Sequence, residues 1–214
     1  MDLRRIAELL APFEPGEALS AEQLQAFSTY LDVLMRWNER INLTSIRSAE
    51  QIVTRHFGES LFAARHLLAL GQRAEVADLG SGAGFPGLPL KIIHRSASVV
   101  LIESQNKKAT FLREVIRALK LTGVQVIAER AETLAREFDL VTMRAVERFE
   151  RALPVAAGLV CPGGRLALLI GAEQAGAAQA ILSDFQWQTS IAIPQSTARV
   201  LLLATKSGRQ DSNQ

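Results

Sequence analysis

The sequence has few of the residues that build disulfides and metal sites. Its 214 residues include one cysteine, Cys161, and three histidines. One thiol cannot form an intramolecular disulfide, and His56, His66 and His94 lack the close spacing of metal ligands. The sequence therefore excludes a disulfide framework and a cysteine-based metal cluster, and we expect no metal site.

Long apolar runs are also missing. No run approaches the roughly 20 residues that a membrane-spanning helix needs, and Glu8 interrupts the first apolar residues too early for a signal peptide. A hydrophobic content of 48% with 21% charged residues is typical of a soluble globular protein. We therefore expect a cytoplasmic protein with no membrane partner, and we take it to be a monomer.

A large excess of charge of one sign is missing as well. The formal net charge is +2, which by itself indicates no nucleic-acid partner. Arginine nevertheless makes up 19 of the 24 basic residues. Arginine suits bidentate phosphate contacts better than lysine, but a biased genome gives the same count, so composition alone does not decide the point.

Residues 1–72 have the pattern of helices. Ser20 followed by Gln23 has the spacing of a helix-capping box. Apolar residues then recur on one helical face, at Leu24, Phe27, Leu31 and Leu34. Ser48 and Gln51 repeat the capping pattern ahead of further apolar residues. The sequence therefore predicts a helical N-terminal extension.

From residue 73 the pattern changes to short apolar runs that alternate with helical segments. The expected strands cover residues 74–79, 98–104, 124–129, 138–145 and 165–170. The expected helices begin near Pro86, follow Ser104, and cover about 132–136, 149–160 and 172–183, with a turn at 161–164. This alternation predicts a Rossmann-like α/β fold, in which a mostly parallel sheet is covered on both faces.

The last part of the chain has a different pattern. Two extended runs, 186–193 and 198–205, are separated by Pro194 and are expected to pair antiparallel. Residues 207–214 have the composition of a frayed tail. No low-complexity linker divides the chain, so we expect the extension, residues 1–72, to pack on an α/β domain of residues 73–206.

The stretch VADLGSGAGFPGLPL, residues 76–90, places four glycines directly after an apolar run. Ligands of a doubly wound sheet bind at the carboxyl ends of the strands, where this loop is expected to lie. Gly82, Gly84 and Gly87 match the dinucleotide pattern G-x-G-x-x-G. An NAD site is therefore one interpretation, although this pattern alone is weak.

Pro86 and Asp78 argue against a dinucleotide. Pro86 removes an amide donor from the first turn of the helix that would hold a pyrophosphate, and Asp78 would place a carboxylate near that dianion. The same carboxylate suits a ligand that carries an ammonium group and a sulfonium centre. Asp78, Gly80, Gly82 and Gly84 form D-x-G-x-G-x-G, which resembles the S-adenosylmethionine (SAM) motif of class I methyltransferases.

A second acid is expected to bind the ribose hydroxyls of either cofactor. Glu103 ends the second expected strand, 23 residues after Gly80, close to the roughly 20 residues typical of that role. Two alternatives stay open: Glu103 could be a solvated strand end, and the glycine loop could be a turn without a ligand.

Several longer stretches carry a more specific resemblance. They are WNERINLTSIRSAEQIVTRHFGES at residues 37–60, DLGSGAGFPGLPLKI, LIESQNKKATFL, RAE at 130–132 and MRA at 143–145. Together they resemble the bacterial RsmG (GidB) family over about residues 24–205. The resemblance implies a class I SAM-dependent methyltransferase that modifies N7 of a guanine in 16S ribosomal RNA. Val146 and Ile170 depart from the family pattern, which often has phenylalanine and lysine there.

The resemblance also implies site residues. Gly80 and Phe85 would line the SAM pocket, Ala131 and Glu132 would lie by the adenine, and Arg144 would bind the cofactor and act in catalysis at the mouth of the active site. For three of these side chains another role stays open. Phe85 could belong to the helix–sheet core, Glu132 could cap a helix, and Arg144 could form a surface ion pair.

An RNA substrate requires cations, and the sequence offers several candidates. They are Arg36, Arg40, Arg55, His56, Lys107, Lys108, Arg144, Arg148 and Arg151. Each could instead be a solvated surface charge, and His56 could be a packing residue.

Three rival functions stay open: a class I methyltransferase acting on another RNA or on a small molecule, an NAD-dependent oxidoreductase, and a non-catalytic RNA-binding protein. Methyl transfer to guanine N7 needs no general base, because N7 is an exposed acceptor that bears no proton.

Overall fold

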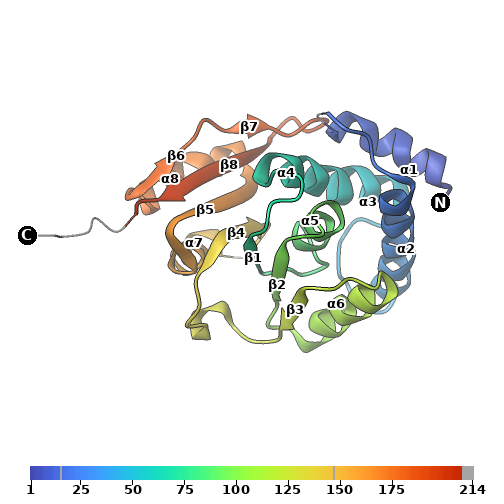
Figure 1. The fold of residues 1–214 in the computed structure, drawn as a ribbon, viewed down its shortest axis with the longest axis horizontal. Helices are drawn as coiled ribbons and strands as arrows, with labels where there is room; N and C mark the ends of the chain where they lie inside the picture. Colours follow the sequence, from blue (N-terminus) through green and yellow to red (C-terminus); the bar gives the residue numbers. More distant parts are fainter. Residues whose placement is uncertain (15, 147, 209–214) are drawn as a thin grey trace, which may run out of the picture.

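The computed structural model describes residues 1–14, 16–146 and 148–208 (Figure 1). Helices make up most of the chain up to residue 67, as the sequence predicts, with non-helical stretches at 16–20 and 39–48. They are α1 (Leu3–Leu10), η1 (Ala11–Phe13), α2 (Ala21–Asn38), α3 (Ala49–Ile52), the π-helical turn η2 (Val53–Gly58) and α4 (Glu59–Leu67). None of the helices in the described ranges has the length and apolar character needed to span a membrane.

The long helix α2 begins at the predicted capping box. The Ser20 amide donates to Gln23 Oε1 at 2.9 Å, and the Gln23 amide donates to Ser20 Oγ at 3.2 Å. These two bonds satisfy amides that the first helical turn leaves without partners. Behind the cap, Phe27, Leu31 and Leu34 are buried, so the predicted apolar face is the one that packs.

The remaining elements form one sheet and the helices that cover it. The strands are β1 (Glu75–Leu79), β2 (Ser98–Ile102), β3 (Val124–Ile127), β4 (Phe138–Arg144), β5 (Val160–Gly171), β6 (Phe185–Trp187), β7 (Ile191–Ala192) and β8 (Arg199–Lys206). Their order is β3-β2-β1-β4-β5-β8-β6, with β7 pairing to β8. The first five strands are parallel, and β8 runs antiparallel to β5. The predicted fold class is confirmed.

Helices cover both faces of this sheet (Figure 1). The helices after the glycine loop are α5 (Gly87–Ile93), α6 (Asn106–Ala118), η3 (Ala131–Thr133), α7 (Phe149–Gly158), η4 (Ala172–Gln174) and α8 (Ala175–Ile181). One core cluster joins α1 to α6 with one face of the sheet, and a second joins α7 and α8 with the other. The N-terminal extension therefore shares its core with the α/β part.

Three sequence expectations need correction or fall partly outside the structure. The helix expected at 132–136 is only the short turn η3, and residues 134–137 are irregular. The turn expected at 161–164 is part of β5, which meets β4 through a shift in register between Phe138 and Leu140. Most of the expected tail, residues 209–214, lies outside the described residues. The expected antiparallel pairing near the end of the chain is present between β6, β7 and β8.

Candidate active site

The glycine loop folds over the carboxyl end of β1. Gly80, Gly82 and Gly84 have φ angles of +68°, +55° and +89°, a region of backbone conformation that side chains with a Cβ rarely adopt. The amides of Gly80 and Ser81 both donate to the carbonyl of Ile102 on β2, at 2.9 and 3.1 Å. The loop is thus tied to the ends of two neighbouring strands.

Asp78 supports this loop from beneath. It is fully buried: its Oδ1 accepts from Thr142 Oγ1 at 2.8 Å, and its Oδ2 accepts from the Gly87 amide at 3.2 Å. Burial raises the pKa of this carboxyl to about 6, although the hydrogen bonds from Thr142, Gly87 and Ser81 act to lower it. In this structure the two oxygens of Asp78 hold Thr142 and the first amide of α5, and its part in cofactor binding stays a prediction.

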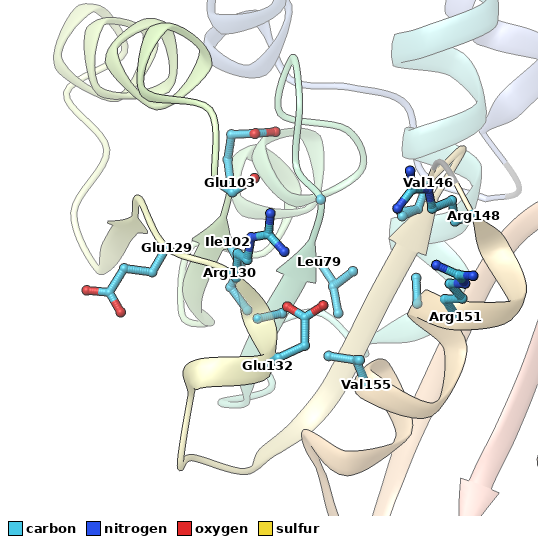
Figure 2. A pocket seen from close by; sticks show the side chains of 14 residues that line it. Leu79, Ile102, Glu103, Glu129, Arg130, Glu132, Val146, Arg148, Arg151 and Val155 are labelled. Atoms are coloured by element: carbon cyan, nitrogen blue, oxygen red, sulfur yellow. The ribbon is translucent and has the colours of Figure 1, made fainter.

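A cavity of about 470 Å³ opens beside the loop, within the size range of small-molecule sites (Figure 2). It lies at the carboxyl ends of β1, β2 and β3, against α7. Its lining residues are Leu79, Gly80, Ile102, Glu103, Ser104, Glu129, Arg130, Ala131, Glu132, Val146, Arg148, Arg151, Ala152 and Val155. Four of the predicted cofactor residues are therefore brought together: Gly80, Glu103, Ala131 and Glu132.

Glu103 joins the cavity to the glycine loop. Its Oε2 accepts from the Gly82 amide at 2.9 Å, and its Oε1 accepts from the Gln105 amide at 2.7 Å. The side chain is nearly buried, so these two bonds fix the direction of the carboxylate. Each carboxylate oxygen can accept more than one hydrogen bond, which leaves acceptor capacity on the cavity side.

The two walls of the cavity differ in charge. Figure 2 shows Glu103, Arg130 and Glu132 on the side of β2 and β3, and Arg148 and Arg151 opposite them, on the α7 side. The exposed pair Arg148 and Arg151 also lines an adjoining depression with Glu173 and Gln174. One wall is therefore mixed but rich in carboxylates, and the other is basic.

Other predicted cofactor residues lie outside the cavity lining. Gly82 and Gly84 shape the loop, whereas Phe85 is buried between two other rings. Its ring centroid is 4.9 Å from that of His56 and 5.6 Å from that of Tyr30, with both pairs stacked. Phe85 therefore lies in the core, as the alternative interpretation of the sequence predicted, and it does not line the cavity.

Arg144 also turns inward and not toward the cavity mouth. Its side chain is 8% exposed, and its Nη2 is 3.0 Å from Glu59 Oε2. Arg199 Nε is 2.9 Å from the same oxygen, and Arg55 Nε is 3.5 Å from Glu59 Oε1. We name Glu59, Arg55, Arg144 and Arg199 the Glu59 cluster. Arg144 thus forms a buried ion pair in place of the surface pair considered as an alternative, and its role in cofactor binding and catalysis stays a prediction.

His56 is held by the same cluster. Its Nδ1 lies 2.9 Å from Arg144 Nη2, and its Nε2 lies 2.7 Å from Thr44 Oγ1. Burial, followed by the charges of Arg144, Arg55 and Arg199, lowers the pKa of His56 to about 3. The ring is therefore neutral and accepts from Arg144 through Nδ1. Both nitrogens are engaged inside the protein, which agrees with the alternative that His56 is a packing residue, and an RNA contact of His56 stays a prediction.

The remaining basic candidates occupy other parts of the surface. Arg36 and Arg40 are exposed around the end of α2, and Lys107 is exposed and Lys108 half-buried at the start of α6. None of these four lines the cavity. Sequence reasoning missed Glu59, Val155 and the strand-end residues Ile102 and Ser104. Of these, only Ile102 and Ser104 could have been found from the sequence, because they lie at the carboxyl end of the predicted strand 98–104, where ligands are expected to bind.

Comparisons with known proteins agree with this geometry. The family model described as rRNA small subunit methyltransferase G matches residues 23–201. The ribosomal RNA small subunit methyltransferase G of Desulfitobacterium hafniense is 47% identical over 152 residues, which are 68% of this chain and 62% of that relative. The protein of the same name from Chloroflexus aggregans is 40% identical over 204 residues, which are 89% of this chain and 85% of that relative.

A solved structure shows the same fold. The crystal structure of a SAM-dependent methyltransferase from Aquifex aeolicus superposes with a TM-score of 0.60, covering 77% of this chain and 96% of that chain. The sequences are 16% identical, so this likeness concerns the fold alone.

Proposed function

Because the chain belongs to the rRNA small subunit methyltransferase G family, we propose that it methylates N7 of a specific guanine in 16S ribosomal RNA. SAM would be the methyl donor, and the small subunit or its RNA the acceptor. The observation that carries the proposal is the family match over residues 23–201, together with a cavity at the strand ends that this match includes. An enzyme with this substrate would work where ribosomes are assembled, in the cytoplasm.

The residues around the cavity fit SAM. A Cβ added to Gly80 would lie 3.0 Å from Val146 Cγ2, and one added to Gly82 would point into space with only the Gly80 carbonyl within 4 Å. The backbone can therefore approach a ligand closely at both positions. Glu103 would accept from the ribose hydroxyls, while Ala131 and Glu132 would border the adenine. Bound SAM supplies an electrophilic methyl group on a sulfonium sulfur.

The charge difference between the walls supports one direction of approach for the RNA. The mixed wall of Glu103, Arg130 and Glu132 would face the adenosine part of the donor. RNA phosphates would be repelled by its carboxylates and attracted by Arg148 and Arg151 on α7. We therefore place the acceptor on the α7 side, beside Val146. The chain's task there is to position guanine N7 in line with the methyl group, since no proton has to be removed first.

Methyl transfer itself tests the proposal. Labelled SAM is incubated with the protein and with 16S rRNA or small subunits from cells that lack it, and the label is mapped to a base. We expect one labelled guanine, methylated at N7. Label on another base, or on a small molecule in place of RNA, would refute the proposed acceptor.

The cofactor is tested separately by thermal stabilisation. A ligand present at 100 times its Kd stabilises the folded protein by about 2.7 kcal/mol. SAM should raise the melting temperature and NAD should not. Stabilisation by NAD alone would favour an oxidoreductase.

A further inference from the structure

The Glu59 cluster places an unusual concentration of charge inside the protein. The Glu59 side chain is 2% exposed, and it faces the guanidinium groups of Arg55, Arg144 and Arg199. Burying charge is costly unless each group is paired. One carboxylate thus compensates the buried Arg144 of β4 and the partly buried Arg199 of β8, and it also faces Arg55 of η2, whose side chain is 56% exposed.

Glu59 occupies the centre of this arrangement because of the local fold. It is the first residue of α4, directly after the π-helical turn η2. π-Helical turns are rare in proteins, and those that occur are often found at functional sites. Glu59 thus lies inside a continuous helical run over residues 49–67, and not at a free helix end. The carboxylate reaches the end of β4 and the start of β8, although Arg144 and Arg199 are distant in sequence.

Arg144 connects the cluster to the cavity through the chain that follows it. Ala145 and Arg148 have φ angles of +48° and +56°, a left-handed conformation that persists only where the surroundings impose it. Between them Val146 lines the cavity next to Gly80, and Arg148 lines it from the start of α7. Because Ala145 and Val146 directly follow Arg144, their conformation depends on how the end of β4 is held.

Arg144 is held from several sides at once. Beyond Glu59, its Nη2 lies 2.9 Å from the Arg55 carbonyl and 2.9 Å from His56 Nδ1. Its guanidinium lies 5.6 Å from the ring centroid of Phe85 in the glycine loop. Without the Glu59 carboxylate, repulsion from Arg55 and Arg199 would favour expulsion of the Arg144 side chain from this position.

We infer that Glu59 is a positioning residue for methyl transfer: by holding Arg144 against His56 and Phe85, it fixes Ala145 and Val146, which directly follow Arg144 and border the acceptor side of the cavity. The inference rests on the proposed function, because its first test measures methyl transfer. The link from Glu59 to Arg144 and His56 can be tested without any activity. Gly80, Glu103 and Glu132, which build the donor side, are not among the ion-pair partners of Glu59.

The test compares Glu59→Gln with the wild type in three measurements. The change keeps the size of the side chain and removes its charge. We expect kcat for methyl transfer to fall by about 10- to 100-fold, the size of effect that a small misplacement of reacting groups produces. SAM affinity by calorimetry should stay within about threefold, because the donor wall is intact.

The third measurement needs no activity. The chain has three histidines, so a ¹⁵N-histidine NMR spectrum is simple to assign. In the wild type, His56 should show a neutral ring protonated at Nε2, with Nδ1 accepting from Arg144. In Glu59→Gln the His56 Nδ1 signal should shift, whereas His66 and His94 serve as internal controls.

Two further variants keep the result decisive. Glu75→Gln removes the carboxylate of another Arg–Glu pair, with Arg136 at 3.1 Å, at the opposite end of β1, and should leave kcat unchanged. Glu59→Asp keeps the charge but shortens the reach, and should restore part of kcat relative to Glu59→Gln. If Glu59→Gln does not fold, Glu59→Asp is compared with the wild type by the same three measurements.

Three results would overturn the inference. An altered His56 signal with unchanged kcat would show a purely structural cluster. A lower kcat with an unchanged His56 signal would show that Glu59 does not act through Arg144. A loss of SAM affinity as large as the loss of kcat would assign Glu59 to the donor site. If the wild type methylates no RNA, the proposed function fails, while the His56 signal still tests the link from Glu59 to Arg144.

Discussion

Asp78 predicts an unusual dependence of stability on pH. Its pKa is raised from 3.8 to about 6 in the folded protein, chiefly by burial. The folded state therefore binds this proton more tightly than the unfolded state does. The resulting stabilisation is fully present below pH 3.8 and is lost as the pH rises through 6. A difference of about two pKa units corresponds to about 3 kcal/mol in the free energy of unfolding.

Asp78→Asn isolates this contribution. An asparagine can still accept from the Gly87 amide through its oxygen, and it can donate to Thr142 Oγ1 through its nitrogen. The Thr142 hydroxyl can then donate to the Ala77 carbonyl, which already lies 3.4 Å away. The variant keeps the hydrogen bonds of the site and removes its titration.

The assay is urea unfolding of both proteins at pH 4, 6 and 8. His56 and His94 also have lowered pKa values in the folded state, so their contribution to stability is lost as the pH falls. Both proteins contain these histidines, so the histidine contribution cancels when the free energies of unfolding of the wild type and Asp78→Asn are subtracted at each pH. We expect Asp78→Asn to gain about 2 kcal/mol relative to the wild type between pH 4 and pH 8, because a smaller part of the total change lies below pH 4. A difference that does not change with pH would refute the reasoning.

Three further variants test the glycine loop. Gly82→Val should weaken SAM binding more than about tenfold by calorimetry, because valine is strained at φ +55° and its side chain points into open space beside the loop. Unchanged affinity would move the cofactor elsewhere. Gly87→Ala should lower the free energy of unfolding by about 1–3 kcal/mol, because its Cβ would lie 2.6 Å from Leu101 Cδ2 and 2.8 Å from Asp78 Oδ2. An unchanged urea midpoint would contradict this packing. Tyr30→Phe should cost about 1–3 kcal/mol in the same assay, because the Tyr30 hydroxyl donates to the Ala83 carbonyl. A neutral effect would show that this carbonyl finds another donor.

The sequence predicts the cavity residues well where they follow a strand. Gly80 and Glu103 directly follow β1 and β2, so their place at one edge of a parallel sheet needs only the strand assignments. Ala131 and Glu132 follow β3 after a short loop. Their place by an adenine came from the family resemblance and stays a proposal.

The inward direction of Asp78 and Arg144 also follows from strand geometry, once the strands are known. Side chains alternate between the faces of a sheet. Val76 belongs to the core cluster on the face covered by the extension, so Asp78 lies on that face, whereas Leu79 lines the cavity. Asp78 pairs in register with Thr142, and Arg144 shares the face of Thr142. Motif matching names such residues without assigning them a face.

The role of Glu59 could not be predicted from the sequence, because its partners are brought together only by the tertiary fold. Its partners Arg144 and Arg199 lie 85 and 140 positions later in the chain, and no periodicity links them. A glutamate within a helical stretch is ordinarily a solvated residue. Only the tertiary fold shows that three arginines converge on it.

These contacts give the helical extension a specific part in the site. Tyr30 of α2 and His56 of η2 stack on Phe85 from the glycine loop, and Glu59 of α4 pairs with Arg144 at the end of β4. The loop and the strand end border the donor and acceptor sides of one cavity. A sheet of this order alone would leave Phe85 exposed and Arg144 unpaired on the face that the extension covers. If the proposed function holds, variants that loosen the extension should therefore impair methyl transfer, even though none of its described residues lines the cavity.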